Sequence, residues 1–484
     1  MKDSGLVRIK LVICQIKKIL LTTVAALSLV AVGVKAHIVR ADSILNAPNT
    51  SVPKPGETVD GKYSFIAQFI KGKTTLKAYA PSGIKWGYHD DPSADPNYGL
   101  TNAILRLSSV PDSAKGKVGV VYQNVGNYNG KTVDLKIALT DWVKRSNNGN
   151  YAVFTRDMIA HTSQADAIQM KWTYIDHETG KSVKVNGFYT FNDIDTGQGF
   201  SFSKSFSQHI DHIYVPIKNS PLLYDNSNGF QSYYSPMDLK TDPLDDEGML
   251  TLLYSGADSM DLTWAGGQKV KDYAGKLATT DNLDISQKPT ALTENYNSQY
   301  IGGDFFQYLA KKPLRTETIP PLKFVSDDDQ KMVKDNTLKN QADTFSYDVQ
   351  FQVPDEWSQF YYKSYALTDE LIPELKLNSI KVTDETGKDV TKSFENKTKD
   401  NHINMSATST SLKTAAFYNH TYMLHMDVQL RTGQNFHKYV DEKTGVTTFK
   451  NTASLTIDGK PASSNTVQTH VNKIKSEIDK WLEA

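Results

Sequence analysis

Residues 448–457 read Thr-Phe-Lys-Asn-Thr-Ala-Ser-Leu-Thr-Ile, a stretch in which apolar and polar side chains alternate. The alternation predicts a β-strand with one face in a core, because successive side chains of a strand point to opposite faces. Phe449 and Leu455 lie on the apolar face, and Asn451 shares it. A buried amide without a partner costs about 1 to 3 kcal/mol. An inward Asn451 therefore needs a hydrogen-bonding neighbour or a chemical use.

Alternating stretches of the same kind recur along the chain in two blocks. In the first block, residues 171–176 and 183–189 flank His177–Gly180, and this arrangement predicts a hairpin around a glycine-containing turn. The second block includes residues 345–353 and 422–430. Three aspartates after Ser326 predict a short helix within residues 326–341, since acidic groups favour a helix N-terminus.

The pattern predicts an all-β protein of two β-sandwich domains, the second of them Ig-like. Prolines at 313, 320 and 321 indicate a boundary between the two domains. Apolar residues recur at helical spacing near the C-terminus and predict a short helix there. The predicted segments are a signal peptide at 1–41, a lead-in at 42–62, an N-terminal sandwich at 63–310, a second sandwich at 316–471 and the helix at 472–484.

The N-terminus has the pattern of a secretory signal peptide. Basic residues precede an apolar run at 19–34, and small residues follow it. A retained membrane anchor is the alternative, but the run is short for a membrane span. The only cysteine, Cys14, lies in this segment, so a processed chain would have neither a disulfide nor a thiolate metal site. We expect a secreted or cell-surface protein with no membrane span after processing.

The charge balance bears on the class of partner. Lys+Arg and Asp+Glu are both 54, so the net charge is zero and does not favour nucleic acid as a partner. The chain also has no Ser-His-Asp or His-Glu-x-x-His pattern and no glycine-rich phosphate loop. We therefore expect no enzyme activity with multiple turnovers.

An inward asparagine can react with a buried lysine when an acid lies beside both. The amine must be uncharged and the acid protonated, and burial favours both states. Asp369 is the candidate acid, because it shares the apolar face of its predicted strand while Glu370 takes the other face. Lys323 begins the second block and is the candidate amine. The alternative is that Asn451 only bonds to backbone at a strand end, with Lys323 in solvent.

The second block resembles the isopeptide-forming D2-type domain of Gram-positive fimbrial proteins and adhesins. The resemblance covers about residues 316–471 and is carried by 322–329, 336–338, 345–347, 382–384 and 450–453. It implies an intramolecular bond between Lys323 and Asn451, with Asp369 as the acid. The bond forms once and requires no cofactor. The resemblance also implies a cell-surface adhesin or a fimbria-like structural protein.

The first block holds a candidate metal site and candidate sugar-stacking rings. Asp193 and Asp195 lie in a glycine-rich stretch and could bind calcium, although a turn that satisfies its own backbone is the alternative. Tyrosines 233 and 234 and Trp86 could stack on sugars, with core packing as the alternative. We expect a surface glycan or matrix protein, of host or microbial origin, as partner. A secreted lectin or glycan-active enzyme built on the N-terminal domain is the alternative function.

Overall fold

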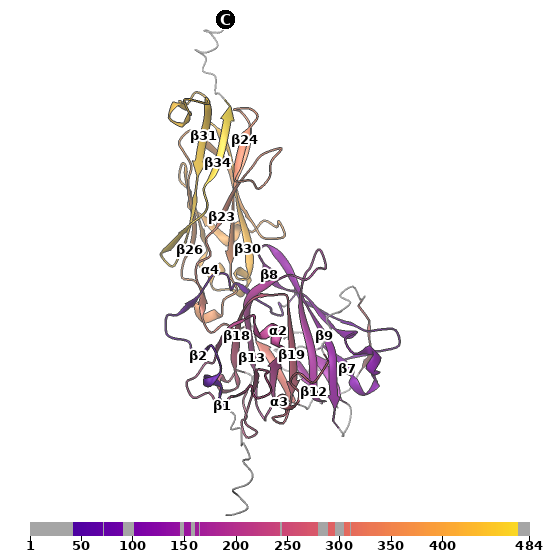
Figure 1. Ribbon diagram of the computed structural model, residues 1–484. Helices are drawn as coiled ribbons and strands as arrows, with labels where there is room; N and C mark the ends of the chain where they lie inside the picture. Colours follow the sequence, from indigo (N-terminus) through magenta and orange to yellow (C-terminus); the bar gives the residue numbers. More distant parts are fainter. Residues whose placement is uncertain are drawn as a thin grey trace, which may run out of the picture. The chain divides into compact units, whose positions relative to one another are not determined.

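The computed structural model describes residues 42–472, apart from 71, 91–100, 146–149, 156–159, 164, 243, 279–288, 296–303 and 310. The predicted signal peptide lies outside these residues, as does the predicted C-terminal helix except for Asn472. Strands dominate the described chain (Figure 1), and the predicted all-β fold class is confirmed. In this part of the chain, no helix combines the length and apolar character needed to cross a membrane.

The described helices are single turns between strands. The α-helical turns are α2 (Lys204–Ser207), α3 (Val270–Tyr273) and α4 (Ser409–Leu412). The 3-10 turns are η1 (Ile44–Asn46), η2 (Leu107–Ser109), η3 (Asp112–Ala114), η4 (Asp246–Gly248), η6 (Ser358–Phe360), η7 (Thr391–Ser393), η8 (Ala415–Phe417) and η9 (His437–Tyr439). Ser203 and Thr408 begin α2 and α4, and each accepts a hydrogen bond from a backbone N–H of its turn.

The first sandwich is built from two large sheets. Within the described residues, the nine-stranded sheet has the spatial order β1 (Asp42–Ser43), β16 (Leu223–Asp225), β17 (Ser232–Tyr234), β14 (Gly199–Phe202), β19 (Ser259–Ala265), β12 (Ala165–Asp176), β9 (Lys131–Lys144), β8 (Val118–Tyr128) and β5 (Thr75–Tyr79). The second sheet has the order β2 (Thr50–Ser51), β15 (Ile210–Tyr214), β18 (Leu250–Ala257), β13 (Val185–Asn192), β21 (Asp304–Leu309), β11 (Ala160–Ser163), β10 (Tyr151–Phe154), β7 (Thr101–Arg106), β6 (Trp86–Asp90) and β20 (Leu292–Asn295), with β4 (Phe65–Ile66) beside β13. A short pair, β3 (Thr58–Val59) and β22 (Arg315–Thr316), joins residues far apart in sequence.

Aromatic side chains fill the core of the first sandwich. Trp172 and Trp264 are buried in it, and the hydroxyls of Tyr174 and Tyr254 lie 2.6 Å apart in a hydrogen bond. The Tyr189 ring stacks against the Tyr174 ring at a centroid distance of 6.1 Å. Rings of this size account for much of the apolar area that the two sheets remove from water.

The hairpin predicted around His177–Gly180 forms only at its turn, where the Val183 N–H donates to the Tyr174 carbonyl at 3.1 Å, and the pairing does not continue. β12 ends at Asp176 in the nine-stranded sheet, whereas β13 begins at Val185 in the other sheet. The two strands share only the isolated bridge between Ile175 and Ser182. The chain therefore crosses from one sheet to the other, and β13 pairs with β18 and β21. Local alternation shows that a strand has a buried face, but the partner is chosen by long-range packing.

The second sandwich contains three smaller sheets around a separate core. In the described chain, the first has the order β23 (Leu322–Ser326), β25 (Thr344–Val353), β30 (His420–Leu430) and β27 (Leu375–Thr383). The second has the order β24 (Asp335–Leu338), β34 (Val467–Asn472) and β31 (Val446–Asn451). The third has the order β28 (Phe394–Asn396), β29 (His402–Ala407), β26 (Tyr365–Glu370), β32 (Ala453–Ile457) and β33 (Lys460–Ser463).

The helix predicted within residues 326–341 is wrong. Asp327 accepts hydrogen bonds from the backbone N–H groups of Asp329 and Gln330 at 3.1 and 2.8 Å, which closes a turn. The chain then forms β24, which pairs in parallel with β34. Aspartates stabilise turns as readily as helix starts, because the side chain competes for nearby backbone groups.

The stretch 448–457 changes sheet in the middle. Its first half is the end of β31, which pairs with β34, and its second half is β32, which pairs with β26. Thr452 separates the two strands, so Asn451 is the last residue before the change. This position places the Asn451 side chain where two sheets of the second sandwich meet.

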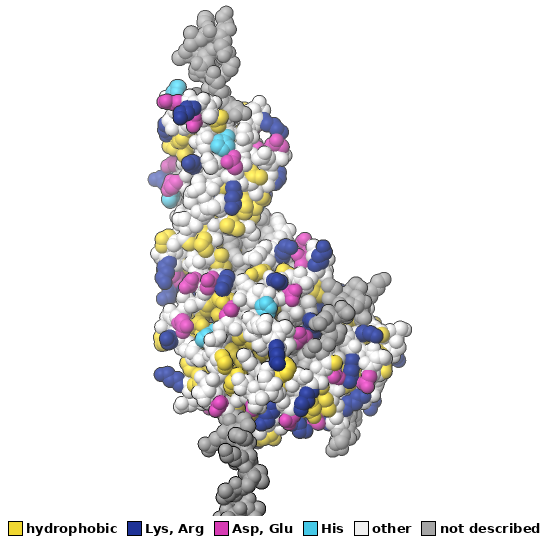
Figure 2. All heavy atoms as spheres, in the orientation of Figure 1, with side chains coloured by type: hydrophobic (Ala, Val, Ile, Leu, Met, Phe, Trp, Pro, Cys, Tyr) yellow, Lys and Arg dark blue, Asp and Glu magenta, His cyan; other side chains and the backbone are white. Residues whose placement is uncertain are grey.

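Charged side chains of both signs are distributed over the visible surface. Figure 2 shows Lys and Arg interspersed with Asp and Glu, with apolar side chains between them. This distribution is the surface counterpart of the balanced composition, 54 basic and 54 acidic residues. The most exposed large apolar side chains of the described first sandwich are Leu244 and Met237, with 67% and 56% of their surface accessible.

Candidate functional site

Lys323 lies on β23 and points into the core of the second sandwich. Its exposed fraction is 0%, whereas the preceding Leu322 is 48% exposed. β23 is the edge strand of its sheet, and the Asn465 side chain bonds to the Lys323 backbone on the open edge. It accepts a hydrogen bond from the Lys323 N–H at 2.9 Å and donates one to the Lys323 carbonyl at 2.9 Å. A side-chain amide thus replaces a strand neighbour and fixes the position of the lysine.

Asp369 meets the Lys323 amine inside the core. Strand β26 alternates as its sequence predicts, so Asp369 is buried and Glu370 is exposed. Asp369 Oδ2 accepts a hydrogen bond from Lys323 Nζ. The Tyr347 ring lies on another side of the amine, with Nζ 4.8 Å from the ring centroid. Carboxylate and ring together offset part of the cost of burying the lysine.

Asn451 completes the group. Its exposed fraction is 5%, and its side-chain amide interacts with the Asp369 carboxyl and lowers the pKa of that group. Two buried oxygens, Asn451 Oδ1 and Asp369 Oδ1, have no hydrogen-bond donor among the described residues. A proton on Asp369 Oδ1 would turn one of these two unpaired acceptors into a hydrogen-bond donor. Unpaired buried oxygens are costly, so the pair favours a protonated acid.

Burial sets the protonation states of the amine and the acid. It lowers the pKa of Lys323, against the attraction of Asp369. Burial also raises the pKa of Asp369, against the opposing effects of Lys323 and of the Asn451 amide. Both directions favour a neutral amine and a neutral carboxylic acid over an ion pair. A primary amide next to a neutral amine and a proton donor is the arrangement that amide exchange requires.

Two residues that support this site were not singled out from the sequence. Tyr347 lies on the inward parity of β25, so the alternation of residues 345–353 could have found it. Asn465 belongs to no alternating stretch and carries no local signal. Asp348 has the opposite parity to Tyr347 and faces the other side of β25. It is held there by Ser326 Oγ at 2.6 Å and His425 Nδ1 at 2.8 Å.

Asp193 and Asp195 lie in a turn after β13. Gln198 Nε2 donates to the Asp193 carbonyl at 2.7 Å and to Asp195 Oδ1 at 2.9 Å. The backbone N–H of Thr241 donates to Asp195 Oδ2 at 3.2 Å. The described residues contain no group of three or more His, Cys, Asp or Glu side chains that could hold a metal ion. These contacts match the local-turn interpretation, and calcium binding stays a prediction.

The Asp193 carboxyl makes the stability of the first sandwich depend on pH. Burial, and then the charge of Asp195, raise its pKa to about 7. A raised pKa stabilises the fold at low pH, and this contribution is lost as the pH rises through about 7. We expect the unfolding free energy to fall by about 1 to 2 kcal/mol from pH 5 to pH 8, after allowance for screening.

Thermal unfolding measured across this pH range tests the expectation, and Asp193→Asn should flatten the curve. Asp112→Asn removes an exposed carboxylate of the same sandwich and serves as the control. Added calcium should raise the melting temperature at pH 8 if the two aspartates bind it. A curve that is unchanged in Asp193→Asn would contradict the assignment of the pH dependence.

The rings proposed for sugar stacking are core residues. Trp86 and Tyr233 are 0% exposed, and Tyr234 is 2% exposed. Tyr233 and Tyr234 belong to β17, which is buried along its length, and Trp86 Nε1 donates to the Tyr79 carbonyl at 3.1 Å. The sugar-stacking interpretation is therefore wrong for these three residues.

Residues 321–471 match the family described as the cell surface antigen I/II C2 terminal domain. The second sandwich thus matches a domain of cell surface antigens, and this match agrees with the predicted surface location.

Several solved structures align with parts of the chain. The N-terminal domain of the Streptococcus gordonii adhesin Sgo0707 aligns at 12% identity over 86% of this chain and 95% of that chain, with a TM-score of 0.34. The C-terminal domain of the Streptococcus pyogenes antigen I/II-family protein AspA aligns at 13% identity over 64% and 96%, with a TM-score of 0.27. BcpA, the major pilin subunit of Bacillus cereus, aligns at 14% identity over 57% and 65%, with a TM-score of 0.25. TM-scores this low add no argument to the domain match. No curated protein matches the chain.

Proposed function

We propose that this protein is an exported adhesin or fimbria-like structural protein whose second sandwich is closed by an amide bond between Lys323 and Asn451. The observation that supports the proposal is the burial of Lys323, Asp369 and Asn451 together, each from a strand of a different sheet. Burial of an amine, an acid and an amide without a chemical use would only destabilise the fold.

The reaction is an amide exchange that needs no cofactor. The neutral Lys323 Nζ attacks Asn451 Cγ, while the protonated Asp369 carboxyl donates to Asn451 Oδ1 and stabilises the developing negative charge. Asp369 then carries a proton from the attacking nitrogen to Asn451 Nδ2. The Cγ–Nδ2 bond breaks, ammonia leaves, and a Cγ–Nζ amide remains. Strands that hold the reactants in contact replace the catalytic apparatus of an enzyme, because proximity lowers the barrier.

The bond would join the first strand of the domain to a strand near its end. β23 pairs only with β25 in its sheet, so it is an edge that tension could peel away. The cross-link closes a loop of roughly 130 residues, and loop entropy then contributes about 5 kcal/mol, as a disulfide of that span would. A strand held covalently near its start cannot separate first, which raises kinetic stability under load.

Mass spectrometry of the purified protein tests the proposal. The chain should be lighter by one ammonia than its processed sequence, and proteolysis should yield a branched peptide that contains both Lys323 and Asn451. Because the branched peptide is identified directly, the result does not depend on where the N-terminus is processed. Separate, unmodified Lys323 and Asn451 peptides would refute the cross-link.

We further propose that the first sandwich presents the binding surface of the adhesin, for a surface glycan or a matrix protein. Arrays of both ligand classes, probed with the purified protein, test this assignment. Specific binding without product release is the expected result. Turnover of a bound glycan would instead favour a glycan-active enzyme.

A further inference from the structure

The connection between the two sandwiches contains a buried lysine that neither core explains. Lys312 lies between β21 and β22 and is 1% exposed. Its Nζ lies 5.2 Å from the centroid of the Phe188 ring, which belongs to the first sandwich. The same Nζ lies 3.3 Å from Glu356 Oε2 and donates to the Asp355 carbonyl at 2.8 Å, both in the second sandwich. The preceding Lys311 carbonyl accepts a hydrogen bond from Thr190 Oγ1 at 2.6 Å, so the connection is anchored on β13.

Two buried acidic residues, Asp355 and Glu356, lie near Lys312. Burial raises the pKa of Asp355 to about 7 and also raises the pKa of Glu356. Asp355 is therefore partly neutral near pH 7. A buried ion pair of this kind contributes little compared with an apolar pair, but removal of one partner leaves an uncompensated charge in the interior.

Two further hydrogen bonds near Lys312 run directly from one sandwich to the other. Gln68 Nε2 donates to Asp355 Oδ2 at 2.9 Å. Gln352 Nε2 donates to Ser64 Oγ at 3.0 Å. Both acceptors are buried, so solvent cannot replace these bonds without an opening of the contact.

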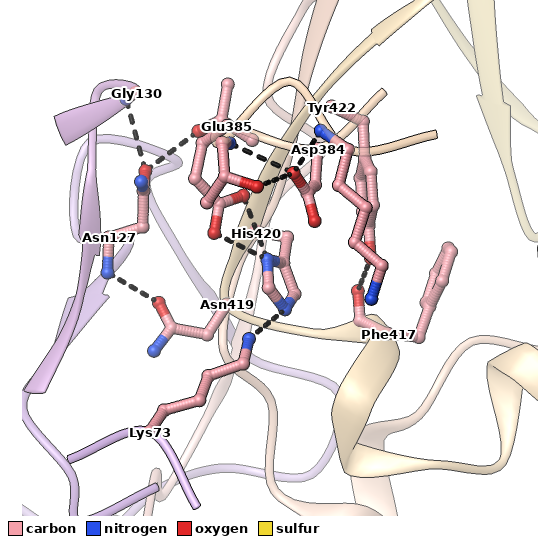
Figure 3. A network of polar contacts seen from close by, with 12 residues as sticks. Lys73, Asn127, Gly130, Asp384, Glu385, Phe417, Asn419, His420 and Tyr422 are labelled. Carbon is pink, nitrogen blue, oxygen red and sulfur yellow. Dashed lines mark hydrogen bonds and ion pairs between the residues drawn. The ribbon is translucent and has the colours of Figure 1, made fainter. Parts of the chain in front are cut away.

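A second group of contacts lies at the β8–β9 hairpin (Figure 3). The Asn127 N–H donates to Asn419 Oδ1 at 3.3 Å, and Thr421 Oγ1 donates to Asn127 Oδ1 at 2.9 Å. Lys73 Nζ lies 3.3 Å from His420 Nε2, and the other ring nitrogen of His420 lies 2.8 Å from Glu385 Oε1. The hairpin therefore bonds to the residues that begin β30. We use the term domain junction for both groups, the one at Lys312 and the one at Asn127.

We propose that the domain junction is a permanent intramolecular lock, with Lys312 as its central residue, so that the two sandwiches act as one mechanical unit. Opening the contact would expose a buried ion pair and leave several buried polar groups without partners. A free hinge between domains has neither feature, because its contacts are few and solvated.

The lock also determines where a load on the first sandwich enters the second. Gln352 lies near the end of β25, Asn419 directly precedes β30, and Thr421 is the second residue of β30. These strands are neighbours in the sheet that carries Lys323 on β23. Force would thus pass from the first sandwich into the sheet that holds the candidate cross-linking lysine. The lock itself does not depend on the cross-link, because none of its residues belongs to that site.

Distance measurements between two spin labels test the lock. Cys14 is the only cysteine, so Cys14→Ser leaves a background without other thiols. Labels at Lys77→Cys on β5 and Lys376→Cys on β27 report on the two sandwiches, and both positions are exposed. We expect one narrow distance distribution. In Lys312→Met the distribution should roughly double in width, since relative motion is the default once a domain interface is lost. Thermal unfolding should then change from one transition to two.

Two further variants distinguish the lock from a general loss of stability. Lys131→Met removes a lysine that pairs with Asp176 at 2.8 Å within the first sandwich, and it should leave the distribution narrow. If Lys312→Met does not fold, the double variant Gln352→Ala and Thr421→Val removes junction bonds without a change of charge and should broaden the distribution. A broad distribution in the unmodified protein, or a narrow one in both junction variants, would overturn the proposal. The Asn451→Ala variant should keep the narrow distribution, which separates the lock from the cross-link.

Discussion

Replacement of Asn451 with alanine is expected to abolish the ammonia-sized mass deficit and to lower the free energy of unfolding of the second sandwich by about 5 kcal/mol. The magnitude follows from loop entropy, because the variant no longer closes the loop that begins at Lys323. For a domain of this size, the loss corresponds to a fall in melting temperature of roughly 10 to 20 °C. Intact-mass measurement and calorimetry on the same sample give both quantities.

A matched control separates the cross-link from the loss of a buried amide. Asn336 is 1% exposed, lies in the same sandwich, and donates to Asp327 Oδ2 at 2.9 Å. Asn336→Ala should destabilise by the cost of one buried hydrogen bond, about 1 to 3 kcal/mol, and should keep the mass deficit. If Asn451→Ala and the unmodified protein have the same mass after correction for the substituted side chain, the bond does not form and Asn451 is an ordinary core residue.

Replacement of Asp369 with alanine is expected to leave both reacting groups in place but unlinked. The variant should show the full sequence mass, since Asn451 loses its proton donor. It should also be less stable than Asn451→Ala, because Lys323 remains in the interior without a carboxylate. A buried amine left without its partner costs about 1 to 3 kcal/mol in addition to the lost cross-link. Mass spectrometry and denaturant unfolding, compared across the two variants, measure the difference.

The neighbouring carboxylate provides the control for this second variant. Glu370 follows Asp369 on β26 but faces solvent. Glu370→Ala should retain the mass deficit and nearly the full stability, because a surface charge contributes little. A mass deficit that persists in Asp369→Ala would show that another group supplies the proton, and the choice of the acid by strand parity would then be wrong.

The alternation of residues along the strands was enough to predict which of the site's side chains point into the core. The alternation in residues 365–371 predicts that Asp369 points inward and Glu370 outward, and the structure has this arrangement. The alternation in residues 448–457 predicts an inward Asn451, which is 5% exposed. The sequence indicated the direction of the Lys323 side chain less clearly, because the apolar residues Leu322 and Phe324 lie on the opposite face of the strand. The structure buries Lys323 and exposes Leu322, since β23 is a sheet edge whose other face meets solvent.

The errors share one physical origin. Residues 171–189 contain two good strand patterns around a turn, yet the strands belong to different sheets. Residues 326–341 contain an acidic start typical of a helix, yet a turn and β24 form instead. In both places a local pattern was compatible with two structures of similar local free energy. Packing against strands far away in sequence then selected one of them.

The sequence by itself determined which segments are strands and which of their side chains face a core, because alternation is a property of neighbouring residues. Only the tertiary structure decided that β31 and β32 divide at Thr452 between two sheets, and that the Asn451 amide meets the Asp369 carboxyl. It also decided that Lys312 is buried at the domain junction and not in solvent. Contacts between residues more than a hundred positions apart depend on which faces pack together to remove apolar area from water, and no local spacing encodes that choice.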